Sequence, residues 1–186
     1  MAGMPISSWM SWEGGVDLVA STVPGSPLPN LIVHVARMVH TPVGSAPSGM
    51  VLWQPDPKGP PLVVGFVSSD PKLAAWFGPH AFAGTPFEKA PALVGRIDTQ
   101  LAGDRATSRV EVAGHRFEVT MHGLAAAELV QRAAGQPMPF AQHGLEAKAT
   151  RVEVAIDGVP LVVHVPAVAM TGGPGALASA AGLYAR

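Results

Sequence analysis

The string Arg-Val-Glu-Val-Ala occurs twice in this chain, at Arg109–Ala113 and again at Arg151–Ala155. In both copies valine alternates with charged or small residues, which is the period of two expected of a β-strand with one buried face. A turn signal follows each copy, Gly114-His115 in the first and Asp157-Gly158 in the second, and another alternating run begins after it. Both copies therefore predict β-hairpins, and we expect the core of the fold where they pack.

The turns also predict the register of each hairpin. Glycine at the first central position indicates a type II′ turn in the first hairpin, and Asp-Gly is a strong hairpin signal in the second. The expected pairs in the first are Val112 with Phe117 and Val110 with Val119. In the second they are Ile156 with Val159, Val154 with Leu161 and Val152 with Val163. Pro160 has no amide hydrogen, so its strand is expected at a sheet edge.

Composition and turn residues predict the other elements. Leu31–Thr41 is rich in Val and Ile and ends before a proline, which indicates a central strand. Further strands are expected at Met50–Gln54, Leu62–Ser68 and Ala92–Asp98. Asp70-Pro71 places a capping residue before a proline, which is typical of a helix start. Two more helices are expected over Leu124–Ala134 and, more weakly, over Pro174–Tyr184.

A chain of 186 residues is expected to form a single domain, residues 1–186. We expect an irregular N-terminal arm over residues 1–30, a sheet-forming body over residues 31–166, and a Gly/Ala-rich C-terminal tail with the weak helix over residues 167–186. The predicted fold class is α+β. It is a mainly antiparallel curved sheet or partly open barrel built from β-hairpins, with two or three short helices.

Composition limits the partners and the compartment. Charged residues make up 13% of the chain against 48% hydrophobic, so much of the surface must be apolar or small, and we expect a homo-oligomer. The net charge of −1, with no run of basic residues, argues against binding to nucleic acid or to an anionic membrane. There is no basic N-terminal segment of a signal peptide and no cysteine, which fits a cytoplasmic protein.

Several chemistries lack their motifs. No His-Glu-x-x-His or other compact ligand pair occurs, so no metal site is predicted. If distant residues did build one, His80, His122, His143 and Glu146 are the positions most free to converge. No Gly-x-Ser-x-Gly string supports a serine nucleophile. The sequence implies no particular cofactor.

A small set of candidate site residues remains. Arg37 interrupts an apolar face of the predicted strand Leu31–Thr41, and a buried arginine must be paired or must bind an anion. Trp53 and Trp76 are the candidate aromatic contacts of a ligand. The candidate catalytic residues are His34, His80, His122 and His143, because histidine transfers protons near neutral pH.

Three functions are compatible with this set. The first is binding of a small, partly apolar and potentially anionic molecule in a cavity, oriented by Arg37 or His34. The alternative is a small enzyme that uses histidine as general acid and base, with or without a metal, and it requires at least two of the four histidines in one cleft. The third is a structural oligomerisation protein, which would have a large apolar interface and no pocket.

Overall fold

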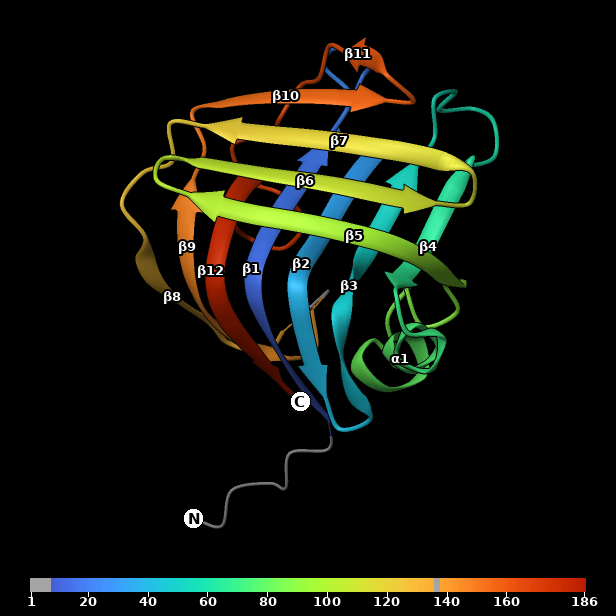
Figure 1. Ribbon diagram of the computed structural model, residues 1–186, viewed down its shortest axis with the longest axis vertical. Helices are drawn as coiled ribbons and strands as arrows, with labels where there is room; N and C mark the ends of the chain where they lie inside the picture. The colour runs from blue at the N-terminus through green and yellow to red at the C-terminus, as the bar shows by residue number, and fades with distance from the viewer. Residues whose placement is uncertain (1–7, 136–137) are drawn as a thin grey trace.

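The computed structural model describes residues 8–135 and 138–186 and shows one open, mostly antiparallel sheet (Figure 1). Across these residues the sheet has 12 strands in the order β11-β10-β7-β6-β5-β4-β3-β2-β1-β12-β9-β8. The strands are β1 Trp9–Ala20, β2 Leu31–Thr41, β3 Gly44–Trp53, β4 Val63–Ser68, β5 Ala92–Ala102, β6 Arg105–Val112, β7 His115–His122, β8 Glu128–Arg132, β9 Ala141–Lys148, β10 Arg151–Ile156, β11 Val159–Leu161 and β12 Ala176–Ala185.

One helical segment is present in the described residues, formed by α1 (Pro71–Trp76) and the π-helix η1 (Phe77–Ala81) that continues it. Its start is the predicted one, because Asp70 accepts a hydrogen bond from the backbone N–H of Lys72 at 2.9 Å and Pro71 occupies the first turn. The fold class is therefore mainly β rather than α+β, since the other two predicted helices are strands.

The sheet doubles over to make two layers. β4 pairs antiparallel with β3 and parallel with the start of β5. In Figure 1, β5, β6, β7 and β10 then run across the long strands β12, β1, β2 and β3. The sheet does not close into a barrel. The prediction of an antiparallel sheet built from hairpins is confirmed.

Two apolar cores lie on opposite faces of the long strands. The first fills the space between the layers, where fully buried side chains such as Leu18 and Val110 meet. The second lies on the other face, where Phe66 of β4 packs with Leu73 of α1 and Phe77 of η1. Each such side chain contributes about 1.5–3 kcal/mol by leaving water. The long strands are thus covered on both faces.

A row of β-bulges crosses β12, β1 and β2. The register of β12 with β9 shifts between Ser179 and Ala181, and that of β2 with β3 shifts between Ala36 and Val39. The register among β12, β1 and β2 does not shift. At this level each of these three strands therefore has one residue more than β9 on one side and β3 on the other. Gly14, with a φ of 63°, is the unpaired residue of β1. An extra residue reverses which face the following side chains occupy.

The second hairpin forms as predicted at its turn. Asp157 and Gly158 have φ values of 54° and 80°, which fit a type I′ turn. The predicted pairs that form are Ile156 with Val159 and Val154 with Leu161. β11 ends at Leu161, so the expected pair of Val152 with Val163 is absent. Pro160 lies in β11, at the sheet edge, as predicted.

The first hairpin turns one residue earlier than predicted. Ala113 and Gly114 are its central residues, with φ values of 51° and 80°, so the turn is type I′ and not II′. The pairs are Val112 with His115 and Val110 with Phe117, in place of the predicted Val112 with Phe117 and Val110 with Val119. Since the pairing shifts by an even step, the valines keep the predicted buried face.

Three segments predicted as irregular or helical are strands. Residues 1–30 include β1, a central strand paired on both sides, while residues 1–7 lie outside the described part. Leu124–Ala134 contains the edge strand β8, and Pro174–Tyr184 contains β12, which lies between β1 and β9. Helix propensity is overridden in β12 because Ala176 and Ala178 fill the core between the layers, where their small side chains fit.

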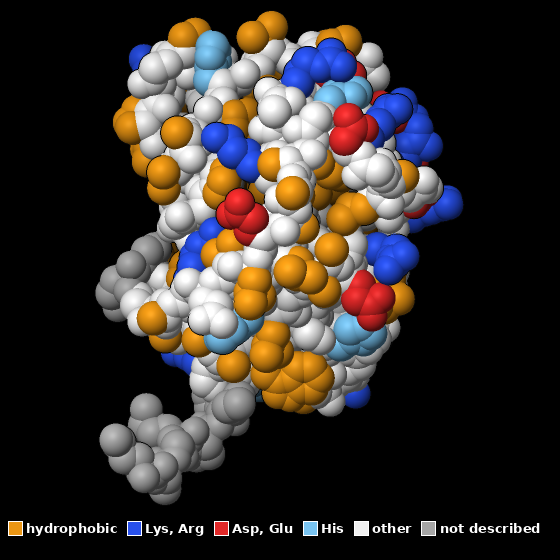
Figure 2. All heavy atoms as spheres, turned by 90° about the vertical axis from the view of Figure 1, so that its left-hand side faces the viewer, with side chains coloured by type: hydrophobic (Ala, Val, Ile, Leu, Met, Phe, Trp, Pro, Cys, Tyr) orange, Lys and Arg blue, Asp and Glu red, His pale blue; other side chains and the backbone are white. Residues whose placement is uncertain are grey.

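The surface is low in charge, as the composition predicts. Figure 2 shows hydrophobic side chains spread among separate charged groups on the side that carries β8 and β9. Leu129, Leu145 and Leu183 of β8, β9 and β12 are among the exposed apolar residues of the protein. Neither α1 nor η1, the helices of the described residues, has the length and the apolar composition needed to cross a lipid bilayer.

Candidate functional site

A cavity of about 60 Å³ lies on the second face of the long strands, between the sheet and η1. A single water molecule needs about 10–15 Å³ on this measure, so the cavity has room for several waters or a small ligand. The end at β3, β4 and η1 is apolar, with Met50, Phe66, Phe77 and Phe82 in its wall. The end at β1, β12 and β9 holds Trp12, Asp17, Gln142, Glu146 and Tyr184, and His34 of β2 lies beside Asp17, while Met10 and Val39 complete the lining.

The bulges decide which side chains reach this cavity. Trp12 and Asp17 both line it although an odd number of positions separates them, and so do Ala36 and Val39. Simple alternation would place the two members of each pair on opposite faces. The bulge at Gly14 and its equivalent in β2 reverse the alternation between them.

At the apolar end three phenylalanines form a cluster. The ring centroids of Phe66 and Phe77 are 5.4 Å apart, and those of Phe66 and Phe82 are 4.9 Å apart. Phe77 lies in η1 and Phe82 directly after it, and both rings contact Phe66 of β4. These distances are in the range of favourable aromatic pairs.

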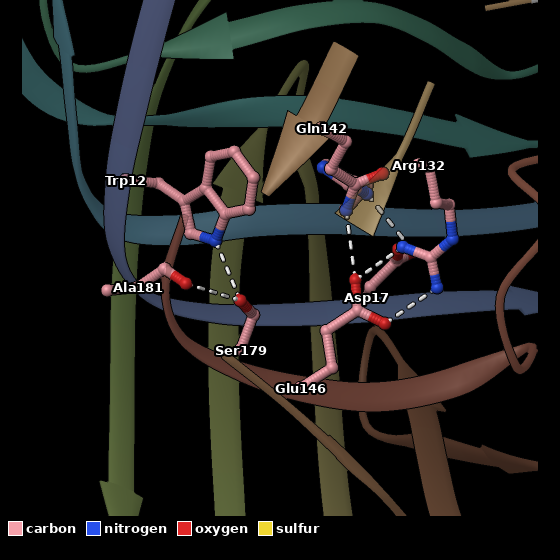
Figure 3. A network of polar contacts seen from close by, with 8 residues as sticks. Trp12, Asp17, Arg132, Gln142, Glu146, Ser179 and Ala181 are labelled. Carbon is pink, nitrogen blue, oxygen red and sulfur yellow. Dashed lines mark hydrogen bonds and ion pairs between the residues drawn. The ribbon is translucent and has the colours of Figure 1, made fainter. Parts of the chain in front are cut away.

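Trp12 lies flat on the sheet because glycines make room for it. A Cβ on Gly182 of β12 would overlap the indole ring, and one on Gly15 would lie 3.3 Å from its Cδ1. The indole Nε1–H donates to Ser179 Oγ at 2.9 Å, which fixes the ring (Figure 3). The ring also contacts Tyr184, with centroids 4.8 Å apart. This aromatic pair makes one wall of the cavity.

Asp17 and His34 are paired positions on β1 and β2, and both side chains line the cavity. Asp17 Oδ1 lies 3.1 Å from His34 Nδ1. This ion-pair contact is the one polar contact of the buried Oδ1 in the described residues, where it makes no further hydrogen bond. His34 is surrounded by protein, yet 40% of its side-chain surface is accessible, because that surface faces the cavity. Asp17 is 15% accessible.

The charges around His34 change its pKa. Burial lowers the pKa of His34, but the charge and the close 3.1 Å contact of Asp17 and the charge of Glu146 raise it by more, so the pKa lies above the usual 6.5. Apart from Asp17, His34 has no polar partner among the described residues. The second ring nitrogen is thus available to a ligand.

Glu146, in contrast, is fully paired. Its side chain is 6% accessible, and Arg132 of β8 donates to both carboxylate oxygens at 2.6 and 2.8 Å. Gln142 donates to Oε1 at 2.9 Å (Figure 3). A bidentate ion pair between guanidinium and carboxylate is among the strong charge-assisted interactions of proteins, and here the amide of Gln142 adds a further hydrogen bond.

The hydroxyl of Tyr184 is the third polar group at this end. Tyr184 is 5% accessible, and its ring stacks on Phe140 with centroids 4.3 Å apart. Burial and the charges of Asp17 and Glu146 raise the pKa of Tyr184 far above its usual 10, so the hydroxyl stays protonated. It has no hydrogen-bond partner within the described ranges.

Of the four predicted catalytic histidines, His34 alone lines the cavity. His80 is exposed and its ring stacks on Trp76, with centroids 5.7 Å apart. His122 Nε2 lies 3.5 Å from Glu153 Oε2, away from the cavity. His143 is exposed on the opposite face of β9 from Glu146. No group of three or more potential metal ligands is found in the described residues.

The predicted ligand contacts lie elsewhere. Arg37 does not line the cavity: its side chain is 64% exposed and pairs with Glu13 at 3.3 Å. Trp53 is part of the core between the layers, and Trp76 packs in the second core. Both tryptophans are structural, and neither lines the cavity.

The residues that build the site include several that sequence reasoning missed, namely Asp17, Tyr184 and Arg132. One signal was present for Asp17, because it is the single charged residue in the apolar run Val16–Ala20. Comparisons with protein-family models, with curated proteins and with solved structures found no match to this chain.

Proposed function

We propose that this protein binds a small molecule with an apolar body and a polar head group in the cavity between the long strands and η1. The observation that carries the proposal is the carboxylate of Asp17, which lines the cavity and whose buried Oδ1 makes no hydrogen bond in the described residues beyond its ion-pair contact with His34. An unpaired buried polar atom costs about 1–3 kcal/mol, and a donor group on a ligand would remove that cost.

The rest of the wall supports the same proposal. Ligand cavities combine mainly apolar walls with a few polar groups that orient the ligand. Phe66, Phe77 and Met50 supply the apolar part, while Asp17 and His34 supply the orienting groups. His34 keeps the orienting role that the sequence suggested, and Arg37 does not take part.

A cavity-filling substitution tests the proposal. Ligand-detected NMR with a set of small fragments should show binding to the wild-type protein. Ala36→Leu should abolish it, because Ala36 lines the cavity. Ala155→Leu, on β10 and away from the cavity, is the matched control and should bind normally. Equal binding by wild type and Ala36→Leu, or no binding of any fragment to the wild type, would contradict the proposal.

The other two candidate functions have less support. The enzyme alternative requires two of the four histidines in one cleft, whereas His34 is the one that lines the cavity. The cavity itself favours binding over a purely structural role. A homo-oligomer and a cytoplasmic location stay predictions from composition, and light scattering and cell fractionation would test them.

A further inference from the structure

The charged groups of the cavity wall are acidic. Asp17 and Glu146 line the cavity, whereas its wall contains no Lys or Arg among the described residues. Arg132 contacts Glu146 with both of its terminal nitrogens, so its positive charge is directed to that carboxylate. His34 is the one basic side chain in the wall. Arg132 balances the charge of Glu146, so Asp17 is the carboxylate that a ligand would meet, with His34 as its charged neighbour in the wall.

Two hydrogen-bond acceptors of the cavity wall make no hydrogen bond in the described part of the chain. The first is the buried Asp17 Oδ1, whose one polar contact there is the ion pair with His34 Nδ1 at 3.1 Å. The hydroxyl of Tyr184 lines the cavity from a side chain that is nineteen-twentieths buried, and it too makes no hydrogen bond there. The phenolic oxygen accepts hydrogen bonds as well as donating one. A ligand nitrogen with two or three N–H groups would satisfy both acceptors.

Aromatic rings make up much of the remaining wall. Trp12 and Tyr184 stand beside the acidic groups, and Phe66, Phe77 and Phe82 line the apolar end. The faces of aromatic rings carry partial negative charge and attract organic cations. These rings also offer apolar surface to the carbon skeleton of a ligand.

We propose that the ligand is a small organic ammonium ion, such as a protonated primary amine on a short apolar or aromatic skeleton. Its N–H groups donate to Asp17 Oδ1 and to the hydroxyl oxygen of Tyr184. Its skeleton lies among the phenylalanines at the apolar end. This inference rests on the proposed function, and it replaces the anionic ligand that Arg37 had suggested.

Three probes of matched shape test the sign of the charge. Benzylamine, benzyl alcohol and benzoate share one ring and differ in the head group, which is cationic, neutral or anionic. Isothermal titration of the full chain at pH 8 should show benzylamine binding about tenfold more tightly than benzyl alcohol, with benzoate weakest, because the ion pair and charge-assisted hydrogen bond are specific to the amine.

Two substitutions locate the interaction. Asp17→Asn removes the charge with little change in shape and should weaken benzylamine binding about tenfold, while benzyl alcohol binding stays within a factor of about two. Tyr184→Phe removes one acceptor and should weaken the amine by a smaller factor. Glu13→Gln is the control, since Glu13 is an exposed carboxylate of the same strand that pairs with Arg37. Retained binding of benzyl alcohol shows that each variant is folded.

The outcomes separate this inference from the proposed function. Benzyl alcohol or benzoate binding as tightly as benzylamine would overturn the cationic ligand and leave a binding cavity in place. An Asp17→Asn protein that binds benzylamine like wild type would also overturn it. Failure of all three probes to bind the wild-type protein would contradict the inference. Failure of the fragment set as well would remove the proposed function.

Discussion

Asp17 Oδ1 and His34 Nδ1 lie 3.1 Å apart on the two neighbouring central strands β1 and β2, inside the wall of a cavity. The charge of Asp17 raises the pKa of His34 more than that of Glu146 does, and neither side chain makes another hydrogen bond in the described residues. The two side chains therefore form one electrostatic unit in the cavity wall. The effects of titration and of substitution at either residue follow from this coupling.

The pKa of His34 depends on Asp17. Asp17→Asn should lower the pKa of His34 from above 6.5 to below 6.5, because burial, which lowers it, would then meet less opposition. NMR titration of the imidazole signals measures this shift. The other six histidines serve as internal controls, since the substitution should leave their titration curves unchanged. A His34 curve that does not move would contradict the coupling.

The same pair makes stability depend on pH. The pKa of His34 is higher in the folded protein than in the unfolded chain, so protonated His34 stabilises the fold. This contribution is fully present below the unfolded value near 6.5 and is lost as the pH rises through the folded pKa. The melting temperature of the wild type should therefore fall over that interval more than that of Asp17→Asn. Parallel melting curves for the two proteins would contradict the argument.

The buried pair of Glu146 and Arg132 should matter for folding. Glu146→Gln leaves the guanidinium without its carboxylate, and we expect the free energy of unfolding to fall by about 2–3 kcal/mol, slightly less than for a fully buried pair. Glu118→Gln breaks an exposed pair with Arg109 and is the matched control, with a much smaller effect expected. Urea denaturation compares the two. Equal losses would show that burial of the pair has no role.

The packing of the Trp12 ring against the sheet should not tolerate a side chain in place of Gly182. A Cβ there would overlap the indole, so Gly182→Ala should displace the ring and lower the free energy of unfolding by about 1–3 kcal/mol. Gly135→Ala is the control, because no atom lies within 4 Å of the Cβ it would add. Tryptophan fluorescence and urea denaturation report the two effects. An unchanged Gly182→Ala protein would contradict this packing.

The turn of the second hairpin should depend on Asp157. Its carboxylate accepts the backbone N–H of Arg116 at 2.8 Å and contacts His115 Nδ1 at 2.8 Å, and both interactions lower the pKa of Asp157. The stability it adds is present above the unfolded value near 3.8 and is lost as the pH falls through the folded pKa. Asp157→Ala should lower the melting temperature more at pH 7 than at pH 2, where only the backbone strain of alanine at a φ of 54° remains. A loss of the same size at both pH values would assign the effect to backbone strain alone.

Local signals predicted much of the sheet. The bounds of β2, the Asp-Gly turn and the helix start at Asp70 follow from residues close in sequence, and the structure confirms them. β1 and β12 were missed because glycine, proline and alanine argue locally against strands. Their pairing with β2 and β9 outweighs that local preference.

The site was less predictable, for a geometric reason. Its residues come from strands far apart in the sequence, and the row of bulges changes which of them face the cavity. Alternation alone placed Arg37 on an apolar face and could not place Trp12 and Asp17 on the same side. His34 was a candidate because of its residue type, and it reaches the cavity from the part of β2 that precedes the bulge.

A crystal structure of the protein with benzylamine tests the central claim most directly. We expect the ligand nitrogen about 2.7–3.0 Å from Asp17 Oδ1, as for a charge-assisted hydrogen bond, with the ring among Phe66, Phe77 and Phe82. A cavity that holds only water at saturating benzylamine, or a bound ligand whose nitrogen points away from Asp17, would contradict it.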